Sequence, residues 1–188
     1  IIDQIPADQP ILFAPDRHLG GWLARETGRQ MVLWDGVCIV HDQFSERELI
    51  KLKGQHPGAP VAAHPECHGG ILQHADHVGS TRSILDFVTT SRETEFIIAT
   101  EMHIIHQMQK QAPGKTFIPA PGNDGSCNCA NCPFMALNSL EKLYLSMVNE
   151  APGIDISEEL RLQALKPLQK MLEMSPPPAK KPMTQAAE

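Results

Sequence analysis

Short apolar runs alternate with helical patterns along most of the chain, and this alternation restricts the possible folds more than any other feature. The runs typical of buried strands are 11–14, 31–34, 60–63, 96–99 and 116–119, and 78–81 is expected to be a short strand and turn that opens the next helix. The helical patterns lie around 19–23, 46–54, 72–75, 84–88, 102–111, 139–147 and 156–174. Strands that alternate with helices predict an α/β architecture with short parallel sheets.

Several of the predicted helices carry start or stop signals. Ser45 and Glu48 form a capping box. In this motif the serine hydroxyl accepts a hydrogen bond from a backbone amide of the first helical turn, and the glutamate carboxylate reaches back to the backbone amide of the serine. Gly28 follows the first helical pattern and is expected to end it. Pro167 lies within the last predicted helix, 156–174, and should kink it.

The composition limits the classes of partner. The 188 residues include 16 Lys and Arg against 22 Asp and Glu, and the net charge of -6 argues against a general nucleic-acid surface. No apolar run is long enough to cross a membrane.

The chain lacks an initiator Met, and because 1–6 resembles the end of a helix we expect a C-terminal fragment. The proline-rich segment 175–188 is expected to be a disordered tail.

Three of the five cysteines crowd into one loop, at Cys127, Cys129 and Cys132. Such crowding suggests a soft-metal site or a redox pair, although cysteines also fill space in cores. A zinc ribbon needs a second closely spaced pair, which the sequence lacks. An odd number of cysteines does not suit a secreted disulfide framework, so a reducing cytoplasm fits better.

Chemically capable side chains follow the ends of several predicted strands. Sites in α/β folds collect at this edge of the sheet. His64 and Glu66 flank a proline, and extended backbone would point both side chains the same way, as proton transfer to a substrate requires. Read alone, such a pair is more often a surface pair. Ser80 and Thr81 offer hydroxyls and amides at a helix start, which suits a carboxylate or phosphate.

Two segments, 11–38 and 96–132, repeat the same order of strand, turn, helix, glycine, strand and cysteine. The turns are Pro15-Asp16 and Thr100-Glu101. If a rotation axis relates the two units, Cys38 and Cys132 meet near it, and a third unit before Ile1 would add a third thiolate around one metal centre. The alternative is that any two βαβ units look alike in outline.

These motifs resemble, in order and spacing, those of the quinolinate synthase family. The matching residues are Gly36-Val37-Cys38 with His41, His64-Pro65-Glu66-Cys67, Gly79-Ser80-Thr81, Thr100-Glu101, and Cys132-Pro133-Phe134-Met135 with Asn138-Ser139-Leu140-Glu141. The resemblance covers nearly the whole chain except the tail. It implies pseudo-repeated three-layer α/β/α domains, three in number, of which each supplies one cysteine to a shared [4Fe-4S] cluster.

The resemblance also implies how the chain divides. Residues 1–38 would be the latter half of the second domain and 39–132 the third. Residues 133–174 would be helices that pack on the first domain, which this C-terminal portion lacks. The first cysteine ligand and the upstream substrate contacts would be missing with it.

The implied activity is that of quinolinate synthase in NAD biosynthesis. The family condenses iminoaspartate with dihydroxyacetone phosphate to quinolinate, with loss of phosphate and water. Three thiolates leave one iron of the cluster open as a Lewis acid. L-aspartate oxidase or aspartate dehydrogenase would supply the iminoaspartate. The alternatives are a cysteine-rich zinc-binding module and a redox-sensing interaction module.

The resemblance assigns roles residue by residue. The implied metal ligands are Cys38 and Cys132, the catalytic residues are Glu66 and His64, and the substrate-binding residues are His64, Glu66, Ser80 and Thr81. Glu66 would be the acid/base, and His41 and Glu101 are expected nearby. Cys67, Cys127 and Cys129 match no ligand position. Some family members carry C-x-x-C-x-x-C where this chain has C-x-C-x-x-C, so a regulatory disulfide is not carried over.

Overall fold

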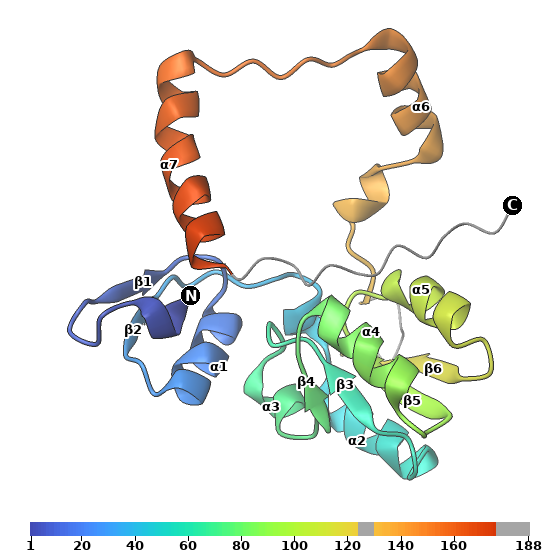
Figure 1. Cartoon of the computed structure of the whole chain (residues 1–188). Helices are drawn as coiled ribbons and strands as arrows, with labels where there is room; N and C mark the ends of the chain where they lie inside the picture. The colour runs from blue at the N-terminus through green and yellow to red at the C-terminus, as the bar shows by residue number, and fades with distance from the viewer. Residues whose placement is uncertain (124–129, 176–188) are drawn as a thin grey trace, which may run out of the picture. The chain divides into compact units, whose positions relative to one another are not determined.

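The structure, a computed structural model, describes residues 1–123 and 130–175. Cys127 and Cys129 lie outside the described residues, and so does the tail predicted at 175–188 apart from Ser175. The chain forms two compact units, one of Pro10–Leu143 and one of Ile1–Gln9 with Tyr144–Glu188. Figure 1 labels the helices and strands.

The larger unit contains two parallel sheets. Strands β1 (Ile11–Phe13) and β2 (Met31–Leu33) pair with each other. The second sheet has the order β4-β3-β5-β6, with bounds β3 Val61–Ala63, β4 His77–Val78, β5 Glu95–Ala99 and β6 Thr116–Pro119. All of these pairs are parallel, and Val61 lies opposite Ile97 in the register. The predicted α/β class with short parallel sheets is therefore confirmed.

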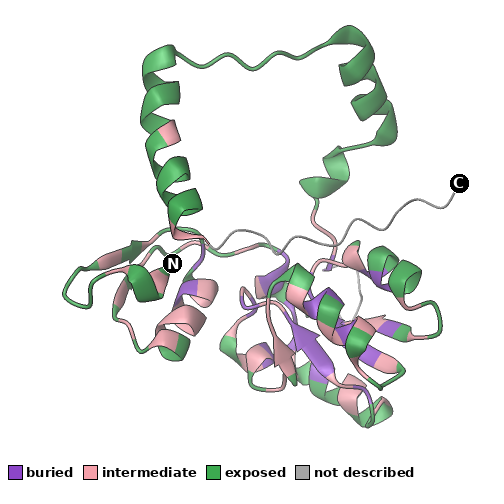
Figure 2. Cartoon of the chain, in the orientation of Figure 1, coloured by how far each residue is buried: buried purple, intermediate pink, exposed green. Residues whose placement is uncertain are grey.

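Helices cover both faces of the four-stranded sheet. Their bounds are α2 Glu46–Gln55, α3 Gly69–Leu72, α4 Thr81–Thr90 and α5 Ile104–Gln111. Successive strand residues point to opposite faces. Val61 and Ile97 belong to one core cluster with Leu49 of α2, while Ile98 belongs to the other with Ile84 of α4. Figure 2 shows the buried residues gathered on β3 and β5, between these helical layers.

Helix α1 (Arg17–Thr27) covers one face of the two-stranded sheet. Gly20 permits this contact, because a Cβ there would lie 2.7 Å from Phe13 of β1 and 2.6 Å from Leu33 of β2. Gly28 has a φ of +66° and ends the helix as predicted. Leu12 of β1 is 73% exposed, so the other face of this sheet has no cover among the described residues.

Two predicted elements begin earlier in the chain than expected. The short strand and turn expected at 78–81 has its strand at His77–Val78, and the Ser80 hydroxyl then accepts from Ser83 N and starts α4. The helix expected at 72–75 is α3, at Gly69–Leu72. The Ser45 hydroxyl caps α2 as predicted, but Glu48 forms ion pairs with nearby basic side chains of α2, including Lys51.

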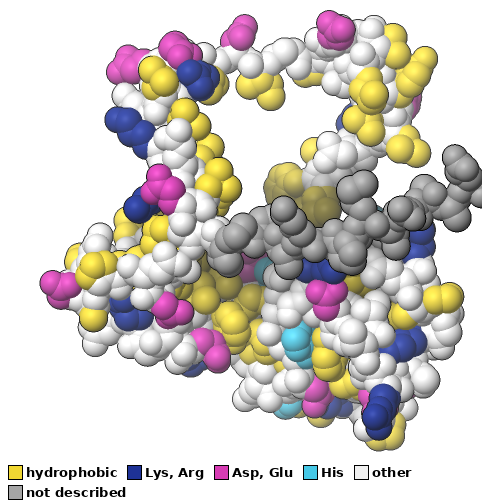
Figure 3. Space-filling view, in the orientation of Figure 1, with side chains coloured by type: hydrophobic (Ala, Val, Ile, Leu, Met, Phe, Trp, Pro, Cys, Tyr) yellow, Lys and Arg dark blue, Asp and Glu magenta, His cyan; other side chains and the backbone are white. Residues whose placement is uncertain are grey.

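The smaller unit is helical. Helix α7 (Glu158–Met174) contains Pro167, and the Gln4 side chain donates to the carbonyl of Met174. Helix α6 (Leu140–Asn149) crosses the boundary between the units. Apolar side chains lie exposed along α7, as Figure 3 shows. Among the described residues, no helix has the length and apolar character that a membrane span requires.

Candidate functional site

A cavity of about 530 Å³ lies at the carboxyl ends of β3 and β5. Most of the residues selected from the sequence line it, namely Cys38, His64, Glu66, Thr81 and Cys132. These residues come from segments far apart in the chain, and the parallel order of the sheet brings them to one edge. The exception is Ser80, which is exposed, does not line the cavity and caps α4 with its hydroxyl.

Strand geometry fixes the position of the His64–Glu66 pair. His64 N donates to the carbonyl of Ala99 at 3.0 Å, which continues the β3–β5 ladder by one residue. The chain then turns, since Cys67 N donates to the carbonyl of His64. The two side chains are 17% and 24% exposed, so both reach the cavity from a largely buried position.

His41 is a buried histidine of the cavity wall. It belongs to the short 3-10 helix His41–Gln43, is 6% exposed, and stacks on His64 with ring centroids 4.5 Å apart. Its Nε2 lies 3.1 Å from Thr100 Oγ1. Its Nδ1 lies 3.0 Å from Glu66 Oε2 but off the direction of a hydrogen bond, and no described residue satisfies it otherwise. The Glu66 carboxylate is therefore the close polar neighbour of this buried nitrogen.

Charge and burial divide the protonation states within this group. The His41 contact lowers the pKa of Glu66, although burial opposes this shift, so the carboxylate is ionised at neutral pH. Burial, with the nearby His41, lowers the pKa of His64 and favours the neutral ring. Because His64 Nδ1 accepts from Glu66 N at 3.3 Å, the proton of the neutral ring lies on Nε2.

The three described cysteines have different surroundings. Cys38 and Cys132 are partly buried and line the cavity, whereas Cys67 is fully buried in the core below it. Cys67 Sγ lies 3.4 Å from the carbonyl oxygen of Ala99 and donates to it, and burial raises the pKa of this thiol. Burial also raises the pKa of Cys38, so a bound metal would be needed to hold this sulfur as a thiolate.

The donor set of the cavity fits a soft metal centre. Two cysteines line it, and cysteine sulfurs are the ligands that iron–sulfur clusters use. A mixed set is also present, because the ligand atoms of Cys38, His41 and Glu66 all lie within 4.8 Å of one another. That set would suit a single divalent ion such as zinc.

Sequence reasoning underestimated two residues of the cavity wall. His41 was expected only nearby, and Thr100 had been assigned to a turn. The Cys38-x-x-His41 spacing could have indicated that both side chains share one short loop. The partnership of His41 with Glu66 depends on the fold, since 24 residues separate them in the sequence.

Comparison with known proteins gives consistent matches. A family model described as "Quinolinate synthetase A protein" matches residues 1–173. Relatives named quinolinate synthase include those of Thermosynechococcus vestitus, 56% identical, Microcystis aeruginosa, 58% identical, and Chloroherpeton thalassium, 54% identical. Each alignment covers 93% of this chain and 54–55% of the relative. The chain therefore spans about half the length of the curated relatives that it matches.

Proposed function

The chain belongs to the quinolinate synthase family, and on this premise we propose that it supplies one wall of a quinolinate synthase active site. The reaction would condense iminoaspartate with dihydroxyacetone phosphate to quinolinate, with loss of phosphate and water, in NAD biosynthesis. The observation that carries the proposal is that Cys38, Cys132, His64, Glu66 and Thr81 line one cavity. L-aspartate oxidase or aspartate dehydrogenase would supply the iminoaspartate.

Cys38 and Cys132 are the proposed ligands of a [4Fe-4S] cluster, with a third cysteine from outside this chain. When bound, such a cluster offers an iron with an open position that acts as a Lewis acid. The described cysteines are free, and thiolate ligands must stay reduced, so the proposal includes the reducing cytoplasm as the compartment.

The remaining side chains would bind the substrates and move protons. Glu66 is the proposed base, because its ionised carboxylate can take up a proton and return it. His64 would donate its Nε2 hydrogen to a substrate carboxylate or hydroxyl. Thr81 begins α4, where the hydroxyl and the free backbone amides suit a phosphate or carboxylate. Ser80 remains a proposed substrate contact only through its backbone, since its hydroxyl caps the helix.

The same proposal includes the division of the chain at residues 38, 132 and 174. Residues 1–38 contain the two-stranded sheet, and 39–132 contain the four-stranded sheet. The apolar side chains exposed on α7 support the expectation that the helices of 133–174 pack on the first domain.

One observation favours a second candidate function, a single bound zinc ion. The ligand atoms of Cys38, His41 and Glu66 lie within 4.8 Å of one another, and His41 Nδ1 lacks a hydrogen-bond partner among the described residues. The intact protein purified without oxygen separates the candidates. Brown protein that contains iron and sulfide supports the cluster, and colourless protein that contains zinc supports the alternative.

The acid/base role is tested by Glu66→Gln in the intact, iron-loaded enzyme. The amide cannot take up the proton, so quinolinate formation should fall by about 100- to 10,000-fold while iron and sulfide stay at the wild-type level. Glu95→Gln is a matched control, since Glu95 also contacts a histidine, at 3.0 Å, but does not line the cavity. Unchanged turnover of Glu66→Gln would refute the assignment.

A further inference from the structure

The two repeated units, 11–38 and 96–132, share hydrogen bonds as well as the order of their elements. The backbone amide that follows the acidic turn residue donates to the carbonyl two positions before the cysteine, in the bonds Arg17 N to Gly36 O and Met102 N to Ala130 O. The carbonyl three positions before the acid accepts a hydrogen bond from the amide just after the second strand, in the bonds Trp34 N to Phe13 O and Ala120 N to Ile98 O. The agreement in register aligns Asp16 with Glu101 and Cys38 with Cys132.

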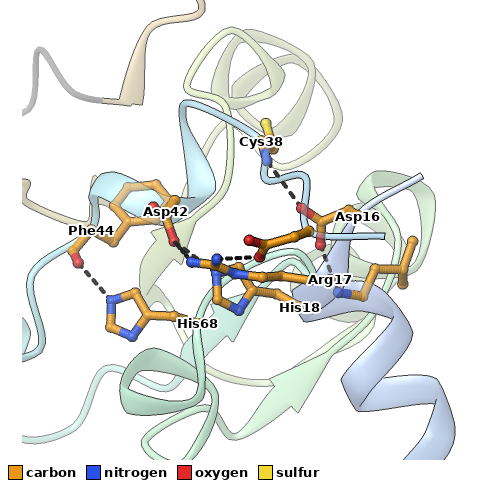
Figure 4. A network of polar contacts seen from close by, with 9 residues as sticks. Asp16, Arg17, His18, Cys38, Asp42, Phe44 and His68 are labelled. Atoms are coloured by element: carbon orange, nitrogen blue, oxygen red, sulfur yellow. Dashed lines mark hydrogen bonds and ion pairs between the residues drawn. The ribbon is translucent and has the colours of Figure 1, made fainter. Parts of the chain in front are cut away.

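The aligned acids make equivalent contacts. Asp16 is 2% exposed, and its Oδ1 accepts from Leu19 N of α1 at 2.7 Å. Its Oδ2 accepts from the backbone amide of Cys38 at 3.0 Å, as Figure 4 shows. Asp16 thus joins the start of a helix to the loop that carries the thiol.

Glu101 repeats this arrangement in the second unit. Its Oε2 accepts from His103 N at 2.9 Å, and its Oε1 accepts from the backbone amide of Cys132 at 3.4 Å and also contacts His103 Nδ1. The side chain of Glu101 is 13% exposed. Both acids therefore spread two oxygens over two amides, one at a helix start and one on a cysteine.

We propose that Asp16 and Glu101 are positioning residues that hold the Cys38 and Cys132 loops so that both sulfurs face one cluster. This inference rests on the proposed function, in which these two thiols are cluster ligands. The arrangement requires a carboxylate, because both oxygens act as acceptors. Asn or Gln would keep one oxygen and turn an NH₂ group toward the second amide, which would leave a largely buried donor without an acceptor.

The carboxylates should also affect the electronic properties of the cluster. Net charge near an iron–sulfur cluster and hydrogen bonds around its sulfurs set its reduction potential. Removing a negative charge next to a ligand favours the reduced, more negative cluster, so the potential should become more positive. A residue that only stabilised the fold would not cause this shift.

The test uses the intact protein, loaded with cluster without oxygen, and the variants Asp16→Asn and Glu101→Gln. We expect Asp16→Asn to lose its cluster to an iron chelator about tenfold faster than the wild type and to have a more positive midpoint potential. Glu101→Gln should shift both quantities in the same direction but less, because its bond to Cys132 is longer. Asp86→Asn is the control, since this exposed carboxylate pairs with Arg82 on α4.

Two outcomes of this experiment would overturn the inference. Wild-type cluster loss and wild-type potential in both variants would show that the carboxylates do not position the thiols, while the proposed function would stand. A wild-type protein that takes up no cluster would refute the proposed function and this inference together.

A further measurement needs no variant. Amide hydrogen exchange of the wild type should show the backbone amide of Cys38 protected, and an unprotected amide would contradict the proposal.

Discussion

At the scale of single residues, His41 sets the properties of the cavity wall. It stacks on His64, lies 3.0 Å from Glu66 and reaches Thr100 with its other nitrogen. One buried ring thus lowers the pKa of the carboxylate and contributes to the lowered pKa of the neighbouring imidazole. The result is an ionised acceptor beside a neutral donor, which is what the proposed acid/base role of Glu66 requires.

His77 provides a test of how burial controls protonation. Its ring stacks on Phe87 with centroids 4.5 Å apart, its Nε2 lies 2.9 Å from Ser83 Oγ, and burial lowers its pKa. The unfolded chain then binds a proton more readily, so this contribution to stability is complete above the ordinary histidine pKa of about 6.5 and is lost as the pH falls below it.

We therefore expect His77→Gln to reduce the loss of stability between neutral pH and about pH 5. The measurement is the free energy of unfolding by urea at a series of pH values. His106→Gln replaces an exposed histidine of α5 and is the control. A wild-type pH profile in His77→Gln would contradict this explanation.

At the scale of elements, close packing at Gly20 fixes α1 against β1 and β2. Gly20→Ala would force the new Cβ against Phe13 and Leu33, and should destabilise the protein by about 1–3 kcal/mol. Gly21→Ala is a matched control, because its Cβ would meet no atom closer than 3.8 Å. Alanine is the better helix former, so that variant should gain up to about 1 kcal/mol. Urea unfolding measures both, and equal effects would contradict the packing argument.

The elements also show what the sequence could predict. The apolar runs located β3 and β5 closely, because these strands are buried on both faces and contain few polar residues. The helix start predicted at Ser80 and Thr81 is confirmed, because a serine between a glycine and an apolar periodic run is a typical helix cap. Asp16 was identified only as a turn residue. Its bond to Cys38 spans 22 positions and depends on how α1 packs.

At the scale of the whole molecule, the chain contains two copies of one βαβ unit, 11–38 and 96–132, and the cysteine at the end of each copy lines the same cavity. The sequence predicted this repeat from the order of elements, while the matching carboxylates appeared only in the hydrogen bonds. The chain spans about half the length of its curated relatives. Under the proposed function, a further βαβ unit outside this chain would supply the remaining ligand.

The central claim is that Cys38 and Cys132 hold one iron–sulfur centre, and iron and sulfide analysis of the intact protein purified without oxygen tests it most directly. The wild type and Cys67→Ala, which alters only a core thiol, should each contain about four irons and four sulfides per chain. Cys38→Ala and Cys132→Ala should each lose the cluster. Iron content at the wild-type level in both of these variants would contradict the claim. Loss of iron only in Cys67→Ala, while that variant stays folded, would contradict it as well.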